Sequence, residues 1–137
     1  MRLAPRLRAG PRSLLLVLLV APLVVCGAAQ PGGNDQQVLD QLRRAGADLT
    51  KPRDIRHYLY FPSAATARSA ADRLRASGYT VDVHASPTPK PGEDWAVVAN
   101  RVMVVNAETI RTERSLMDEV ARQGQGVYDG WEAAAKP

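Results

Sequence analysis

The segment that decides the fold is IRHYLYFPS, residues 55–63. Its first seven residues alternate, as expected for a strand in which every second side chain faces the same side. One side carries Ile55, His57, Leu59 and Phe61, and the other carries Arg56, Tyr58 and Tyr60. Pro62 and Ser63 then end the strand and begin a helix, with the serine as its N-cap. The segment therefore predicts a strand that passes directly into a helix.

The residues after this segment predict two further strands, a second helix and a closing strand. The predicted elements are, in chain order, a helix from Ser63 to Gly78, a strand over residues 79–84, a stiff proline-rich loop over 86–93, a strand over 95–105, a helix from Asn106 to Gly124 and a short strand over 127–131. The resulting order, β-α-β-β-α-β, is that of a ferredoxin-like α+β fold.

This fold predicts a four-stranded antiparallel sheet with both crossover helices on one face. Two right-handed crossings place the first and third strands at its centre. We expect one core to contain Leu59, Phe61, Leu74, Val81, Val97 and Val120. A helix over residues 35–45, with Asp35 as its N-cap and its own apolar stripe, is additional to the fold. It must dock on the sheet edge or on the open face of the sheet.

The N-terminal residues have the three parts of a secretory signal. Residues 1–12 carry four arginines and no acidic residue, residues 13–25 contain no charge and are mostly apolar, and small residues follow up to Ala29. Thirteen helical residues span about 20 Å, less than the roughly 30 Å of a bilayer core. We therefore expect a signal peptide or lipoprotein leader over 1–29, a linker over 30–34 and the domain over 35–137. The domain is expected in the periplasm, free or anchored to the membrane.

Cys26 is the single cysteine, and it lies at the end of this leader. The sequence from Leu23 to Gly27 resembles the lipobox of bacterial lipoproteins, whose cysteine is acylated, although Val25 stands where a small residue is usual. Cleavage after Ala29 and an uncleaved anchor are the two alternatives. In every case the domain has no pair of cysteines, so its stability must come from its core.

The positive net charge of the chain comes from the leader. Four of the 18 basic residues precede the apolar stretch, and the other 14 are balanced by 14 acidic residues from Asp35 onward. Proteins that bind nucleic acid need a basic surface, which neutralises phosphates. The neutral domain therefore argues against a nucleic-acid partner.

Two parts of the sequence resemble a known family. The element Tyr128-Asp-Gly-Trp-Glu132, together with DLTKPR at residues 48–53 leading into HY-x-YFP at residues 57–62, is similar to the regulator of ribonuclease activity B family. The resemblance extends from about Val38 to Glu132. It implies a ferredoxin-like fold and a non-enzymatic, protein-binding role, since the best-known members inhibit ribonuclease E.

The element at residues 128–132 also has a direct interpretation. Strand alternation predicts that Val127 and Trp131 face the helices as core residues, and that Tyr128 and Glu132 face the open side near Tyr58 and Tyr60. Such an aromatic surface would bind a protein or peptide, or be covered by the N-terminal helix. The candidate partner-binding residues are Tyr58, Tyr60, Tyr128, Asp129, Gly130, Trp131 and Glu132.

No pattern in the sequence indicates an enzyme, a cofactor or a metal site. His57 shares its side of the strand with apolar residues, which favours a hydrogen-bonded core histidine, and His84 lies at a strand end where exposure is usual. We therefore expect an exported, non-enzymatic binding or regulatory domain with a protein partner. A small structural or oligomeric envelope lipoprotein, with Cys26 as its lipidation site, is the alternative.

Overall fold

The computed structural model describes residues 34–136. The predictions for the leader, for Cys26 and for most of the linker lie outside these residues. The elements are α1 (Asp35–Arg44), β1 (Arg53–Phe61), α2 (Ala64–Ala76), β2 (Thr80–Ala85), β3 (Trp95–Met103), α3 (Ala107–Gln123) and β4 (Val127–Ala133). The predicted order of helices and strands is confirmed, including the additional helix before the first strand. Within this part of the chain, no helix has the length and apolar composition needed to cross a membrane.

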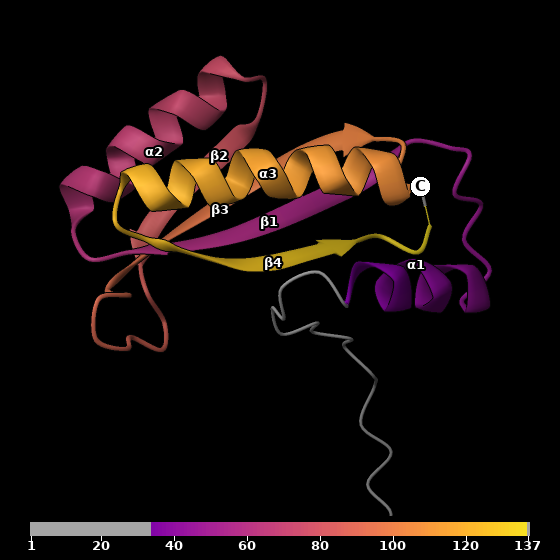
Figure 1. Cartoon of the computed structure of the whole chain (residues 1–137), viewed down its shortest axis with the longest axis horizontal. Coiled ribbons are helices and arrows are strands. Elements are labelled where there is room, and N and C mark those ends of the chain that lie inside the picture. Colours follow the sequence, from indigo (N-terminus) through magenta and orange to yellow (C-terminus); the bar gives the residue numbers. More distant parts are fainter. Residues whose placement is uncertain (1–33, 137) are drawn as a thin grey trace, which may run out of the picture.

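The four strands form one antiparallel sheet in the order β2-β3-β1-β4. The first and third strands are central, as the right-handed crossings predict. Helices α2 and α3 lie together on one face of the sheet, whereas α1 lies beside the end of β4, on the side away from α2 (Figure 1). The other face of the sheet is called the open face below.

The helix starts follow from local hydrogen bonds. The Ser63 hydroxyl accepts from the Thr66 backbone N–H at 3.2 Å, and Asn106 forms a capping box with Thr109, so both predicted caps are confirmed. For α1 the predicted cap is wrong, because the N-cap is Asn34 and Asp35 is the first helical residue. The Asp35 carboxylate is directed away from its own helix, toward Arg114 and Trp131.

The main core lies between the sheet and helices α2 and α3. It contains all six residues predicted to share it, each less than 8% exposed: Leu59, Phe61, Leu74, Val81, Val97 and Val120. The alanine stripe of α2, Ala67, Ala70 and Ala71, is also buried there, which lets this helix approach the sheet closely.

A second core fixes the position of α1. Leu39 and Leu42 of α1 pack with Ile55, Ile110 and Trp131, from three other elements. The Asp35 carboxylate accepts hydrogen bonds from the Arg114 guanidinium, at 3.0 and 2.6 Å, and from the Trp131 indole at 3.0 Å. Of the two docking positions that the sequence left open, α1 therefore takes the sheet edge, next to α3.

Candidate functional site

A β-bulge in β4 decides which candidate residues face the open side. Leu59 of β1 pairs with Tyr128 and Tyr58 pairs with Gly130, so Asp129 is the extra residue. Gly130 has φ +109°, a conformation that favours glycine. Because the bulge shifts the alternation by one residue, Tyr128 and Trp131 both face the helices.

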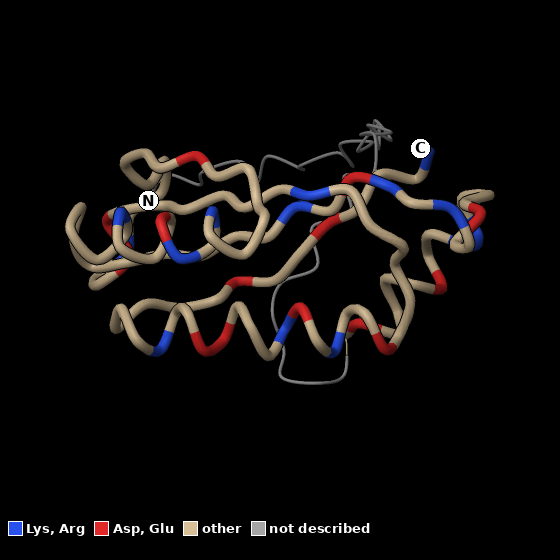
Figure 2. The backbone as a smooth tube through the Cα atoms, turned by 90° about the horizontal axis from the view of Figure 1, so that it is seen from above, with Lys and Arg blue, Asp and Glu red and all other residues tan. Residues whose placement is uncertain are grey.

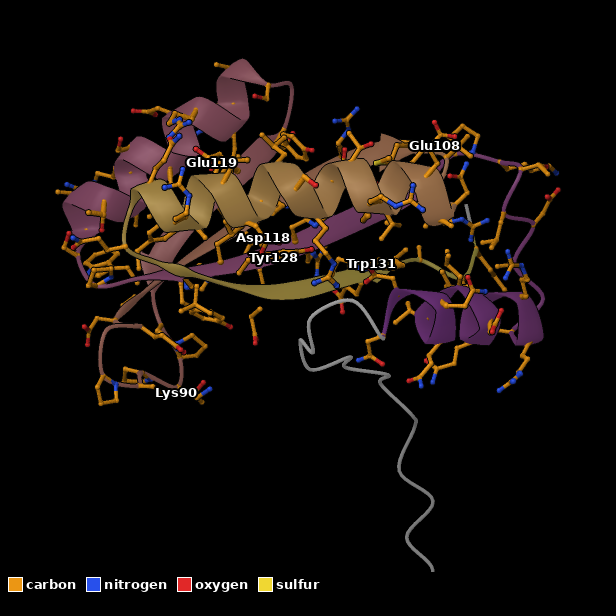
Figure 3. The ribbon with its side chains drawn as sticks, viewed as in Figure 1. Lys90, Glu108, Asp118, Glu119, Tyr128 and Trp131 are labelled. Carbon is orange, nitrogen blue, oxygen red and sulfur yellow. The ribbon has the colours of Figure 1, made fainter. Side chains whose placement is uncertain are left out.

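The bulge corrects two predictions about β4 and supports two others. Tyr128 does not face the open side; it is 7% exposed and belongs to the main core. Val127 does not face the helices; it pairs with Tyr60 on the open side and is 47% exposed. Trp131 is buried on the helix side and Glu132 lies on the open side, both as predicted. Figure 3 shows Tyr128 next to α3 and Trp131 near α1.

Tyr128 belongs to a buried polar network beneath α3. Its hydroxyl lies 2.9 Å from Nδ1 of His57, and Nε2 of the same ring lies 3.2 Å from Oε2 of Glu113. Since a carboxylate can only accept, Nε2 carries a proton and donates it to Glu113, while Nδ1 shares a hydrogen bond with the Tyr128 hydroxyl. Tyr79 also donates to Glu113, and Arg101 lies 3.4 Å from its other oxygen. The expectation that His57 is a hydrogen-bonded core residue is confirmed.

The protonation of this network follows from its burial. Burial raises the pKa of the Glu113 carboxyl, but the hydrogen bonds from His57 and Tyr79 and the charge of Arg101 outweigh it, so the net shift is downward. Burial and the hydrogen bond to Glu113 raise the pKa of Tyr79 to about 12. Burial also raises the pKa of Tyr128. The carboxylate therefore stays ionised and both phenols stay protonated.

This network does not form a substrate site, because its central groups are inaccessible. A hydroxyl, an imidazole and a carboxylate in sequence resemble an acid–base relay. However, His57 is fully buried, Glu113 is 5% exposed and Tyr128 is covered by the main core. The network instead connects β1, β4 and α3 and satisfies their buried polar groups.

The open face divides into an aromatic end and a polar end. At the aromatic end, near the β2–β3 loop, Tyr58 and Tyr60 are half-buried, and Val98 and Val127 lie beside them. At the polar end, next to α1, a row of side chains crosses all four strands: Thr80, Asn100, Arg56 and Glu132. Two of the predicted residues, Tyr58 and Glu132, meet where these ends join.

Hydrogen bonds hold the polar end together. The Tyr58 hydroxyl donates to Oε1 of Glu132 at 2.7 Å, and the Arg56 guanidinium lies 3.3 Å from the same oxygen. Nε of Arg56 donates to the Asn100 side-chain oxygen at 2.9 Å. Burial, together with the bond to Glu132, raises the pKa of Tyr58. Unlike the buried network, these groups are reachable, since Arg56 and Glu132 expose 53% and 38% of their side chains.

A groove of about 630 Å³ lies between α1 and this polar end. Its lining residues come from α1, from β1 and β3, and from the C-terminal end of β4 and the residues after it: Val38, Gln41, Leu42, Ala45, Asp54, Arg56, Asn100, Glu132, Ala133, Ala134 and Ala135. Its size lies in the usual range for ligand pockets. The sequence did not predict this groove, because its walls combine residues about 90 positions apart.

Residues 34–136 contain no group of three or more histidine, aspartate, glutamate or cysteine side chains that could hold a metal ion. Asp129 is exposed at the bulge, and Figure 2 shows acidic and basic residues interleaved along α3. The described surface of α3 thus has no large region of one sign, as expected from the balanced charges of the domain.

The chain was compared with families of known proteins. The model of the family described as regulator of ribonuclease activity B matches residues 33–133. The match spans every helix and strand described above. No curated protein matches the chain.

Proposed function

The chain belongs to the regulator of ribonuclease activity B family, and on this premise we propose that it is an exported, non-enzymatic domain that binds and regulates another protein. Membership of the family supports a protein-binding role of the ribonuclease-regulator kind. The face of the sheet that α2 and α3 leave uncovered is where we place the binding surface. The leader sequence supports the export.

The observation that carries the proposal is the exposed aromatic end of the open face. Helices α2 and α3 both lie on the opposite face, and α1 reaches only the polar end. Val127 is 47% exposed, and Tyr58 and Tyr60 are half-buried beside it. Tyrosine side chains are frequent anchors of interfaces because they combine a large apolar area with a polar group and lose little conformational entropy.

The charges of the open face favour a protein over a nucleic acid. Arg56 is accompanied there by Asp54, Asp82 and Glu132, which lie on the same side of β1, β2 and β4. A surface that stacks bases needs positive charge along the phosphate backbone. This face has an excess of carboxylates instead, so a polypeptide is the partner that we propose.

Site-specific photo-crosslinking in cells that express the full chain tests the proposed surface. A photoreactive phenylalanine derivative replaces Tyr60 or Val127 on the open face, and Arg68 or Arg122 on the outer sides of α2 and α3 as matched controls. We expect crosslinks to one protein from the two open-face positions only. A crosslinked species of twice the mass would favour the oligomeric alternative. Equal crosslinking from the helix positions, or none from the open face, would refute the surface.

The same cells test the location. We expect the full chain in the periplasmic or membrane fraction, because the leader has the form of a secretory signal. Replacing Cys26→Ser separates the two routes: loss of lipid labelling supports acylation, and unchanged processing supports cleavage near Ala29. A soluble cytoplasmic pool with Met1 intact would contradict export.

A further inference from the structure

The groove between α1 and the open face points to a defined ligand chemistry. We propose that it receives the side chain of an arginine or lysine from the partner protein, with the aliphatic part of that side chain between the walls and its charged group on the floor. This inference rests on the proposed function, since it concerns how the partner is recognised. It adds a specific subsite that lies apart from the aromatic end.

The walls of the groove fit the aliphatic part of such a side chain. Val38, Leu42 and Ala45 lie three or four residues apart and share one face of α1. Residues 133–135, all alanines, form the facing wall. Arginine and lysine commonly bury their methylene groups along apolar surfaces while their charged ends contact polar groups.

The floor of the groove has a net negative charge. Its charged residues are Asp54, Arg56 and Glu132. The Asp54 carboxylate is exposed and makes no hydrogen bond or ion pair in the part of the chain described here, whereas the Arg56 guanidinium is engaged by Asn100 and Glu132. Glu132 receives both Tyr58 and Arg56 on Oε1, which leaves Oε2 available. A cation in the groove would therefore find two carboxylates, only one of which has a cationic neighbour at ion-pair distance.

Other ligand chemistries fit this floor less well. An anion could approach Arg56, but it would be repelled by the nearby Asp54 carboxylate and would compete with the pair that Arg56 already forms with Glu132. An entirely apolar group would remove the Asp54 carboxylate from water without giving it a hydrogen bond, which is costly. A guanidinium or ammonium group satisfies the carboxylates directly.

Two anchors, one buried and one partly buried, hold the groove in place before any ligand binds. Arg53, 1% exposed, donates to the carbonyl oxygens of Ala134 at 2.7 Å and Ala135 at 3.1 Å, which fixes the alanine wall. Asp35 fixes the start of α1 through Arg114 and Trp131. A binding site that is already formed loses less conformational entropy when it binds.

Two synthetic peptides that differ in one charge test the proposal. They are Ac-Ala-Ala-Arg-Ala-Ala-NH₂ and the same peptide with citrulline, the neutral isostere of arginine, in place of the arginine. Each is titrated into the isotopically labelled full chain, and binding is followed by NMR. We expect the arginine peptide to shift the signals of Gln41, Asn100 and residues 133–135, and the citrulline peptide to bind at least tenfold more weakly.

Variants of the floor provide the second measurement. Asp54→Asn combined with Glu132→Gln keeps the hydrogen-bond acceptors and removes both negative charges, so arginine-peptide affinity should fall at least tenfold. Asp118→Asn removes one exposed charge from α3, outside the groove, and should leave the affinity unchanged. Near-UV circular dichroism of the variants checks that the fold is kept.

The proposal is overturned if citrulline binds as well as arginine, if the double variant behaves like Asp118→Asn, if the shifted signals lie outside the groove, or if the arginine peptide does not bind at millimolar concentration. These outcomes are independent of the crosslinking experiment. Crosslinks from Tyr60 and Val127 without arginine binding would refute the groove alone. Arginine binding without such crosslinks would refute the aromatic surface alone.

Discussion

Two polar networks lie on opposite sides of the same strand, and their residues alternate along β1. His57 faces the helices and joins Tyr128 to Glu113; its neighbour Tyr58 faces the open side and binds Glu132. Both networks contain a tyrosine hydroxyl, a carboxylate and an arginine. They differ in access to water, because Glu113 is 5% exposed whereas Glu132 exposes 38% of its side chain.

This difference in exposure gives similar groups different roles. In the buried network, water cannot take the place of a lost hydrogen-bond partner. Removing one group therefore leaves another buried group unsatisfied. In the exposed network, water replaces any partner that is lost, and the bonds contribute little to stability. The exposed groups can therefore exchange partners when a ligand arrives, and the buried groups cannot.

The largest effect is expected from a change to the strand that both networks share. Leu59→Ala should reduce the free energy of unfolding by roughly 2–5 kcal/mol, because Leu59 is fully buried and its loss leaves a cavity in the main core. Urea denaturation measures this change. A loss within 0.5 kcal/mol would mean that the assignment of the faces of β1 is wrong.

The next effect concerns the carboxylate of the buried network. Glu113→Gln should cost about 1–3 kcal/mol, because an amide replaces an ionised acceptor that His57, Tyr79 and Arg101 all contact. Glu132→Gln is the matched change in the exposed network and should cost less than about 0.5 kcal/mol. Equal losses in the two variants would contradict the distinction between the networks.

A pair of single-atom deletions sharpens the distinction further. Tyr128→Phe should cost about 1 kcal/mol, since it leaves Nδ1 of His57 buried without its hydrogen-bond partner. Tyr58→Phe should leave stability within about 0.5 kcal/mol, because water can replace its hydroxyl at Glu132. Thermal and urea unfolding of both variants measure the difference, and a reversed order would refute it.

A smaller effect is expected from pH. The folded-state pKa of Glu113 lies below its ordinary value of 4.5. Its contribution to stability is therefore complete above about pH 4.5 and is lost as the pH falls through the lowered value. Between pH 5 and pH 3, unfolding free energy should fall more steeply for the native chain than for Glu113→Gln. Identical slopes would mean that folding does not lower the pKa of Glu113.

The last prediction is that the chain has no effect on the activity of ribonuclease E. The purified full chain should not inhibit ribonuclease E at micromolar concentration, because members of one fold family can bind different partners, and the export that we propose would separate this chain from a cytoplasmic enzyme. Cleavage of an RNA substrate by the nuclease, with and without the chain, measures this. Tight inhibition together with cytoplasmic retention would contradict the proposed location and assign the open face a ribonuclease partner.

The fold was predictable from sequence because its signals are local and repeated. Alternation in β1, the caps at Ser63 and Asn106, and the alanine stripe of α2 each specify an element without knowledge of the others. Together they determine the order of elements, and handedness then determines the order of strands. The main core was predictable for the same reason.

The networks were less predictable because they depend on single irregularities. Strict alternation placed Tyr128 on the open side, and only the bulge at Asp129 reverses it. Gly130, an isolated glycine within a strand, was the available signal for a bulge. Glu113 was missed although it lies between Ile110 and Met117 on the apolar stripe of α3, where a carboxylate indicates a buried polar partner. The groove depends on where α1 docks, which no local pattern specifies.

The bulge also affects how copies of the protein can meet. β4 is an outer strand of the sheet, and a regular outer strand offers a row of backbone donors and acceptors to which a strand of another molecule can add. The extra residue in β4 breaks the even spacing of that row, and Asp129 places an exposed charge on it. Both features disfavour the addition of a strand from a second copy along β4. The irregularity that places Tyr128 in the core therefore also makes this edge of the sheet a poor template for edge-to-edge pairing.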